Sequence, residues 1–188
     1  MEERFADSLV GEHIVIRKGR MSDLDAVHAN VYSDEVLLST MFMGITREKV
    51  ASEARLQRTI KLQRDNPLYF VALKQTDEVI GVCGIREEAP GVYSEAGLAI
   101  ARQYQGRGYA VEMLHLLLDY AFLQLDAREF VYYCMDFNER SKGLARHFGF
   151  HYQSTAAEVR EYDQKEFQIE RYTLSREEYL GRAETSVR

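Results

Sequence analysis

A short stretch near the middle of the chain has the residue types of an anion-binding loop. Residues 103–110 read QYQGRGYA and lie between the apolar run AGLAI and the amphipathic run VEMLHLLLDYAFLQL. Helix N-termini leave backbone N–H groups without intrahelical acceptors, and glycines let a phosphate approach them without a Cβ in the way. The stretch therefore predicts a phosphate site in which Arg107, between Gly106 and Gly108, supplies a countercharge. A loop that simply turns the chain explains the same residues about as well.

The stretch departs from two common phosphate-binding motifs. No glycine in it is followed by Lys-Ser or Lys-Thr, as a P-loop requires. The run GRGYAV lacks the third glycine of the dinucleotide fingerprint, and no βαβ pattern surrounds it. The residues alone therefore predict an anion site and leave its ligand open.

The elements around this loop follow from periodicity. Beyond Tyr109 the apolar residues recur every three or four positions, which predicts a long helix packed through one face. The segments 93–100 and 129–136 are rich in apolar, aromatic and β-branched residues and predict strands. Residues 138–150, NERSKGLARHFGF, predict a short helix that ends at Gly149. The loop thus lies between a strand and the strongest helical pattern of the chain.

The remaining segments alternate in the same way. They predict strands over 13–19, 68–75, 79–87, 150–161 and 166–174. They also predict one helix with Ser22 as its N-cap and a second helix over 46–65. This order predicts an α/β fold with a mixed, mostly antiparallel central sheet of about seven strands flanked by about four helices. With 188 residues, of which 46% are hydrophobic, the chain fits one domain.

Composition narrows the class of protein. A net charge of -6 and a pI near 5.5 disfavour a general nucleic-acid binder, so an anion site has to be local. The N-terminal run MEERFADSLV has no signal-peptide pattern, and no stretch reaches the about 18 apolar residues of a membrane span. Cys83 and Cys134 lie in apolar strand-like segments, where buried thiols are expected and a disulfide is not. We expect a cytoplasmic protein without nucleic-acid or membrane partners.

Two blocks of the sequence resemble a known family. The run 103–110 carries Q-x-x-G-x-G-Y-A, which is similar to the acetyl-CoA motif of the GCN5-related N-acetyltransferases, or GNAT superfamily. Twenty-eight residues after Ala110, the run 138–150 carries N-x-x-S-x-x-L and ends in GF. It resembles the branch that includes the ribosomal-protein N-terminal acetyltransferases RimJ and RimL. The match is good over 93–150 and weaker elsewhere.

The resemblance implies a GNAT fold with splayed central strands and acetyl-CoA as acyl donor. A single domain over 1–188 would divide into a substrate-side half at about 13–90, an acetyl-CoA core at about 92–150 and a C-terminal hairpin at about 151–180. In this family the pantetheine arm pairs with a strand edge and is bound by an asparagine, while the pyrophosphate lies on the loop amides. The implied cofactor-binding residues are Leu98, Ala99, Ile100, Gln103, Gly106, Arg107, Gly108, Tyr109, Ala110 and Asn138.

The resemblance also indicates which residues move protons. Many members protonate the departing thiolate with a tyrosine, but that position here is Ala145. The ribosomal-protein branch carries a serine three residues after the asparagine, and Ser141 matches it. Its hydroxyl is suited to donate a proton to the thiolate, whereas a capping role in the first helical turn is the alternative.

The candidate base is Glu95. It lies two residues before Gly97, where this branch often has an acidic residue that faces the acceptor. A desolvated carboxylate there has a raised pKa and accepts a proton directly or through water. A solvated or salt-bridged strand glutamate explains the residue equally well.

The expected activity is transfer of acetyl from acetyl-CoA to a primary amine by direct attack in a ternary complex. The branch suggests a protein N-terminus as acceptor, and polyamines, amino acids or antibiotics are the competing amines. The loops expected to face the acceptor carry no motif that identifies this amine. The chain is expected to be a monomer or homodimer. No metal ligand set is recognisable. A non-catalytic acetyl-CoA-binding module and a nucleotide-binding regulator are the alternatives to an enzyme.

Overall fold

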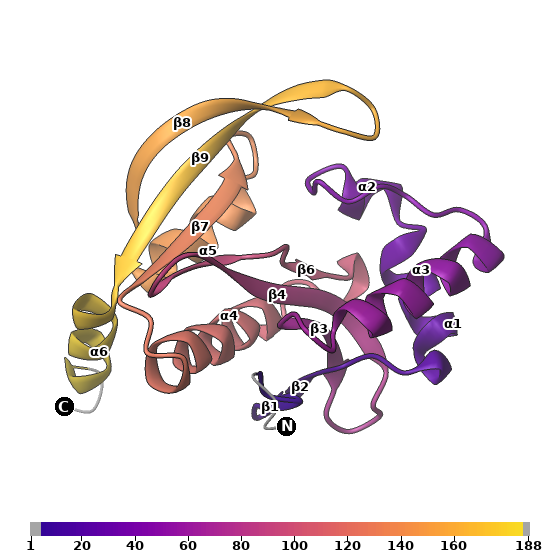
Figure 1. Ribbon diagram of the computed structural model, residues 1–188, viewed down its shortest axis with the longest axis horizontal. Helices are drawn as coiled ribbons and strands as arrows, with labels where there is room; N and C mark the ends of the chain where they lie inside the picture. Colours follow the sequence, from indigo (N-terminus) through magenta and orange to yellow (C-terminus); the bar gives the residue numbers. More distant parts are fainter. Residues whose placement is uncertain (1–4, 186–188) are drawn as a thin grey trace. The chain divides into compact units, whose positions relative to one another are not determined.

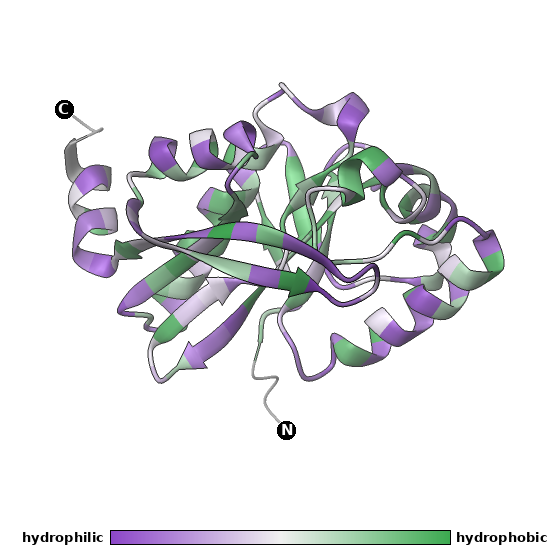
Figure 2. Cartoon of the chain, turned by 90° about the horizontal axis from the view of Figure 1, so that it is seen from above, coloured by the Kyte–Doolittle hydropathy of each residue, from purple (hydrophilic) through white to green (hydrophobic). Residues whose placement is uncertain are grey.

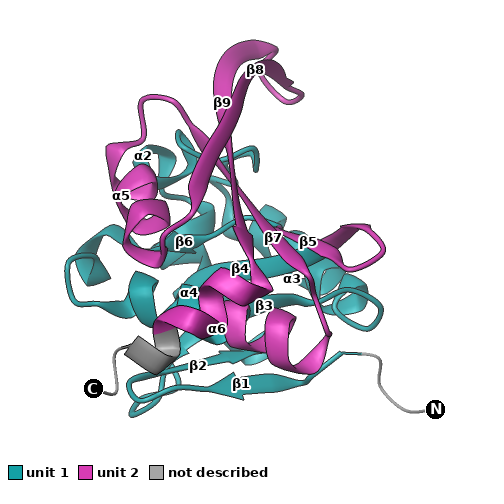
Figure 3. Cartoon of the chain, turned by 90° about the vertical axis from the view of Figure 1, so that its left-hand side faces the viewer, with its two compact units in different colours: residues 1–86, 96–117 teal, residues 87–95, 118–188 magenta. Residues whose placement is uncertain are grey.

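Apolar and amphipathic runs of the sequence form nine strands and six α-helices in a computed structural model that describes residues 5–185 (Figure 1). Within the described part the chain forms two compact units (Figure 3). The first unit comprises 1–86 and 96–117, and the second comprises 87–95 and 118–188. Residues that the sequence predicts to bind the cofactor or to catalyse occur in both units.

The first unit is built on antiparallel strands in the order β1-β2-β3-β4-β6. The four central residues of β3 and the first seven of β4 are all buried, which explains the nearly continuous apolar runs in the sequence. The strands are β1 (Ser8–Val10), β2 (Ile14–Arg17), β3 (Leu68–Leu73), β4 (Val79–Ala89, whose last residues belong to the second unit) and β6 (Ala99–Ile100).

The helices of the first unit supply its core. Side chains from the first helices, α3, the strands and the segment after α2 form one buried cluster that includes Val31, Tyr32, Leu56 and Phe70. Figure 2 shows hydrophilic residues distributed along α3, which therefore buries few residues. The elements are a 3-10 turn (Met21–Asp23), α1 (Leu24–Val27), a π-helical turn (His28–Tyr32), α2 (Glu35–Leu38), α3 (Lys49–Leu62) and α4 (Tyr109–Asp119).

The first helical segment starts earlier than the sequence predicts. Its N-cap is Arg20 rather than Ser22, and the Asp23 carboxylate accepts from the Arg20 N–H at 2.8 Å. The expected serine cap is therefore wrong, because a carboxylate satisfies the N-terminal amide instead.

The second unit contains four strands in the order β5-β7-β9-β8. Strands β5 and β7 run parallel, and the other two pairs are antiparallel. Figure 3 shows β8 and β9 as a long hairpin, and nine of the ten β8 residues are exposed. The elements are β5 (Val92–Glu95), a π-helical turn (Tyr120–Gln124), β7 (Glu129–Met135), α5 (Glu139–Phe148), β8 (His151–Arg160), β9 (Lys165–Ser175) and α6 (Arg176–Thr185).

One predicted strand is broken in the structure. Residues 93–100 were expected to form a single strand, but β5 ends at Glu95 and β6 begins at Ala99. Gly97 between them has φ of +96°, a conformation that L side chains rarely adopt and that extended strands do not use. The break explains why an apparently continuous apolar run supplies residues to both units.

The predicted fold class is confirmed, with more elements than expected. The strands are mixed and mostly antiparallel, and the predicted strand and helix of 129–150 are present with the helix closed by Gly149 at φ of +76°. Strands β1 and β6 have three and two residues, and α2 has four, which is too short for periodicity to reveal. No helix within residues 5–185 is long and apolar enough to cross a membrane.

Candidate active site

The predicted anion loop has an open backbone in the structure. Gly106 and Gly108 have φ of +76° and +84°, and a Cβ on either would meet no described atom within 4 Å. The Glu112 amide is bonded to the Gly108 carbonyl, so the amides that precede it in the first turn of α4 have no intrahelical acceptor. The loop therefore offers donors, the positive end of a helix dipole and room for an anion.

Side chains on the other side of the loop hold it in place. Gln103 donates to the Asn30 side-chain oxygen at 2.7 Å, and the Tyr104 hydroxyl donates to Glu78 at 2.9 Å. The Arg107 guanidinium lies 5.5 Å from the centre of the Tyr104 ring. The Gln103 side chain thus anchors the loop. The groups suited to an anion are the backbone amides of the loop and the Arg107 side chain.

Strand β6 presents one edge to β4. Ile100 lies opposite Gly81 and Ala99 opposite Val82, and within the described residues β6 pairs with no other strand. A Cβ on Gly81 would lie 2.2 Å from the Ala99 carbonyl oxygen, so this close approach requires glycine. Of the predicted backbone contacts, Ala99 and Ile100 lie on a strand with a second edge, whereas Leu98 precedes it.

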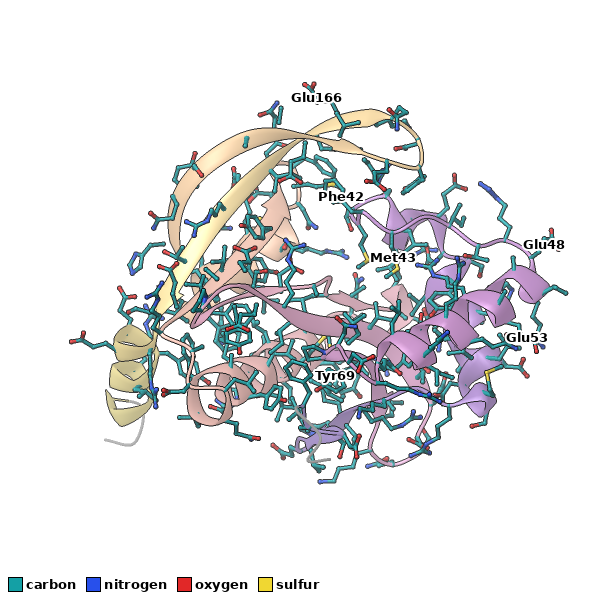
Figure 4. All side chains as sticks on the ribbon, viewed as in Figure 1. Phe42, Met43, Glu48, Glu53, Tyr69 and Glu166 are labelled. Atoms are coloured by element: carbon teal, nitrogen blue, oxygen red, sulfur yellow. The ribbon has the colours of Figure 1, made fainter. Side chains whose placement is uncertain are left out.

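A long arginine organises the segment after α2. The Arg55 guanidinium lies 4.2 Å from the centre of the Tyr32 ring and donates to the Gly44 carbonyl at 2.6 Å. Burial lowers the pKa of Arg55. Figure 4 shows Phe42 and Met43 on this segment, and Met43 also contacts Arg55. The segment between α2 and α3 is thus fastened to α3, although no motif indicated this.

In the second unit, Asn138 and Ser141 have different structural tasks. Asn138 is the N-cap of α5, and its side chain accepts from the Ser141 amide at 3.2 Å. The Ser141 hydroxyl lies 2.8 Å from the Tyr132 hydroxyl. Asn138 therefore caps the helix, which leaves the Ser141 hydroxyl for the residues of β7.

Two residues of β7 face this hydroxyl. Tyr132 and Cys134 are two apart on the strand and therefore lie on one face. Burial, with a contribution from Glu170, raises the pKa of the Cys134 thiol to about 11, although its hydrogen bond to Ser141 opposes the shift. Burial likewise raises the pKa of Tyr132. Both groups therefore stay protonated near neutral pH.

Glu95 belongs to the same neighbourhood. It ends β5, whose register with β7 pairs Ser94 with Val131, so Glu95 and Tyr132 each lie one residue further along. The Glu95 charge contributes to the raised pKa of Tyr132, although less than burial does. The two predicted catalytic residues thus come together around Tyr132, which no sequence motif includes.

Glu112, in the first turn of α4, binds the start of β2. Its carboxylate accepts from the His13 and Ile14 amides at 2.8 and 3.2 Å, and the His13 ring lies 3.0 Å away. Burial acts to raise the pKa of Glu112, but these hydrogen bonds outweigh it and the pKa is lowered. The residue that follows the glycine loop therefore stabilises the first unit.

Comparison with known proteins decides the family. Residues 13–151 match the family described as the acetyltransferase (GNAT) domain, which is most of the 188-residue chain. The chain belongs to the GNAT family. It is therefore an N-acetyltransferase that uses acetyl-CoA, as the sequence motifs indicated.

Individual GNAT relatives agree with this assignment. The uncharacterized N-acetyltransferase p20 of Bacillus licheniformis is 30% identical over 125 residues, 64% of this chain and 68% of that protein. A GCN5-related N-acetyltransferase from Brucella melitensis has a TM-score of 0.82 at 18% identity, over 95% of this chain and 82% of that one. RimL, a ribosomal L7/L12 α-N-protein acetyltransferase with coenzyme A in a disulfide to a cysteine, has a TM-score of 0.73 at 20% identity, covering 88% and 96%.

The residues of the first unit fit acetyl-CoA. A pyrophosphate needs converging amide donors and a close approach to the backbone. The loop from Gly106 to Ala110 provides both, because its two glycines have no Cβ and the space where a Cβ would lie is open. Arg107 adds a positive charge beside it.

The open loop predicts a specific cost for added side chains. Gly108→Ala forces an L residue into a positive φ, so we expect a loss of about 1–2 kcal/mol in stability. Coenzyme A affinity should fall about tenfold. Gly143→Ala is the matched control, because Gly143 also has no described neighbour within 4 Å of its Cβ position but lies inside helix α5. The control should gain about 0.5–1 kcal/mol. Equal effects in urea unfolding and calorimetric binding would contradict the positive-φ argument.

Glu112 predicts a pH-dependent contribution to stability. Because its folded pKa is lowered, the ionised carboxylate stabilises the fold above its unfolded pKa of about 4.3, and this is lost as pH falls through the folded pKa. Glu112→Gln should therefore lower the unfolding free energy by about 1 kcal/mol near neutral pH. The difference from wild type should shrink below about pH 4.

The control for this measurement is Glu53→Gln on α3. Glu53 is exposed in Figure 4 and should tolerate the change at every pH. Urea titrations at a series of pH values measure both variants. A Glu112→Gln deficit that stays constant on acidification would contradict the stated cause.

Proposed function

We propose that the enzyme transfers acetyl to the α-amine of a protein N-terminus by direct attack in a ternary complex. The observation that carries the proposed chemistry is the cluster of Glu95, Tyr132 and Ser141, in which a carboxylate and a hydroxyl both lie near one buried tyrosine. Acyl transfer to an amine needs a group that takes the amine proton and one that protonates the departing thiolate. The cluster contains one of each.

Ser141 is the proposed acid. The usual tyrosine position of α5 is Ala145, which is buried, so that helix supplies no phenol there. The backbone amide of Ser141 donates to the Asn138 side chain, and the Ser141 hydroxyl lies beside Cys134. In RimL a cysteine forms a disulfide with coenzyme A, and a thiol of this chain next to Ser141 agrees with a leaving sulfur in this neighbourhood.

Glu95 is the proposed base. It is half-buried at the end of β5, next to a residue whose hydroxyl keeps its proton. A carboxylate in such a place accepts the proton of an attacking ammonium or amine directly or through water. In the alternative interpretation Glu95 is only a structural residue of the strand. Its substitution would then leave catalysis unchanged, so a variant distinguishes the two roles.

Acetyl-CoA supplies the thioester when it is bound. We assign its pyrophosphate to the amides from Gly106 to Ala110 with Arg107, and its pantetheine arm to the unpaired edge of β6. Asn138, in the second unit, retains side-chain N–H groups for a ligand while its oxygen caps α5.

The acceptor rests on likeness to RimL, whose name states α-N-acetylation of a ribosomal protein. The competing acceptors are small cationic amines, which the net charge of -6 favours. A non-catalytic acetyl-CoA-binding module remains the alternative from another class, since it needs the loop but neither Glu95 nor Ser141.

A panel of acceptors tests the proposal. Thiol release from acetyl-CoA should be fastest with peptides that present a free N-terminus, and slower with N-terminally blocked peptides, polyamines and amino acids. Preference for polyamines or antibiotics would contradict the protein acceptor but not the chemistry. Binding of acetyl-CoA without turnover on any amine would favour the module.

Two variants test the roles. Ser141→Ala should lower kcat about 100-fold with little change in KM for acetyl-CoA, and Glu95→Gln should lower kcat/KM and remove the acidic limb of its pH profile. Ser154→Ala on the exposed strand β8 is the control and should retain full activity. Full activity of the first two variants would refute the assignments.

A further inference from the structure

One residue of the cluster has no role in the proposed function. Tyr132 is 3% exposed, its ring centre lies 5.5 Å from that of Phe150, and its hydroxyl lies 2.8 Å from the Ser141 hydroxyl. A buried hydroxyl needs a partner, and neither of the two family motifs, at 103–110 and 138–150, includes a residue of β7. Tyr132 therefore calls for a chemical explanation as well as a packing one.

Proton counting fixes the direction of its hydrogen bond in a working site. Each of the two hydroxyls carries one proton, so only one of them donates across the 2.8 Å contact. If Ser141 donated to Tyr132, it would have no proton left to give to a departing thiolate. If Tyr132 donates to Ser141, the serine proton is directed away from Tyr132. The Cys134 thiol also bonds Ser141, but a thiol is a weaker acceptor than a departing thiolate.

The surroundings of Tyr132 support this direction. Burial raises its pKa, and the nearby Glu95 charge adds to the effect, so the phenol keeps its proton throughout the neutral range. A phenol with these properties is a poor acid for direct use but a persistent hydrogen-bond donor. The parallel register of β5 and β7 places Glu95 beside Tyr132, so this carboxylate is a neighbouring group from which the phenol can be reprotonated.

We propose that Tyr132 is a positioning residue that links Glu95 to Ser141 as a proton relay, aiming the serine proton at the leaving sulfur and restoring it after transfer. This inference rests on the proposed function of Ser141 and Glu95. It assigns Tyr132 a role that acts through Ser141 rather than on the substrate.

The relay balances the reaction. The amine nitrogen forms a bond to the acetyl carbon and gives one proton to Glu95, and the carbon–sulfur bond breaks. Ser141 gives its proton to the departing sulfur, takes that of Tyr132, and Tyr132 is reprotonated from Glu95, directly or through one water. The products are an amide and a free thiol, and all three side chains end in their starting protonation states.

The test uses Tyr132→Phe, which keeps the ring against Phe150 and removes only the hydroxyl. We expect kcat to fall about 10- to 100-fold while KM for acetyl-CoA and the melting temperature change little. Tyr133→Phe is the matched control, because Tyr133 is the next residue of β7, faces the other way and bonds Glu88 at 3.2 Å. The control should keep wild-type kcat.

A second measurement does not depend on turnover. The thiol of bound coenzyme A is titrated by its ultraviolet absorbance in wild type, Tyr132→Phe and Tyr133→Phe. A serine proton aimed at the sulfur stabilises the thiolate, so Tyr132→Phe should raise the pKa of the bound thiol by about 0.5–1 unit. A wild-type protein that binds coenzyme A without turnover would refute the proposed function, yet this titration would still report whether Tyr132 orients Ser141.

The double variant separates a relay from packing. Ser141→Ala/Tyr132→Phe should be no slower than Ser141→Ala alone, because both substitutions interrupt one pathway. Additive losses, or a Tyr132→Phe enzyme with wild-type kcat and an unchanged bound-thiol pKa, would overturn the proposal.

Discussion

The coenzyme A site that we propose depends on a helix N-terminus, that of α4, whose first amides have no intrahelical acceptor. Gly106 and Gly108 keep positive φ and expose the backbone before α4, while Gln103 holds the loop through Asn30. Unpaired amides are costly unless water or a ligand satisfies them, so this helix terminus is suited to an anion. A contact with a neighbouring strand holds this terminus in place, since Glu112 in the first turn of α4 accepts hydrogen bonds from the start of β2.

The second unit follows a different constraint, the number of protons that a buried hydroxyl pair can share. The cap that Asn138 gives to α5 frees the Ser141 hydroxyl, and the alternation of β7 places Tyr132 and Cys134 beside it. Burial keeps both β7 groups protonated, so they tune hydrogen bonding rather than carry charge. In our proposal the acid is therefore Ser141, supported by a strand, rather than a residue at position 145 of α5, which is Ala145 here.

The elements with strong local patterns could be predicted from the sequence. The period of α4 and the glycine at 149 predicted two helices, and both are present, whereas the anion site that the loop glycines indicate stays a prediction. The break at Gly97 was missed, since an apolar run hides a single positive φ. Tyr132 was missed because its partner lies nine residues away on another element, and only tertiary packing joins them.

Amide hydrogen exchange with and without coenzyme A tests the central claim most directly. The amides from Gly106 to Val111 should exchange fast in the free protein and become strongly protected on binding, because the pyrophosphate becomes their acceptor. Residues of the exposed strand β8 should not change. Tight coenzyme A binding that leaves these loop amides unprotected would contradict the account.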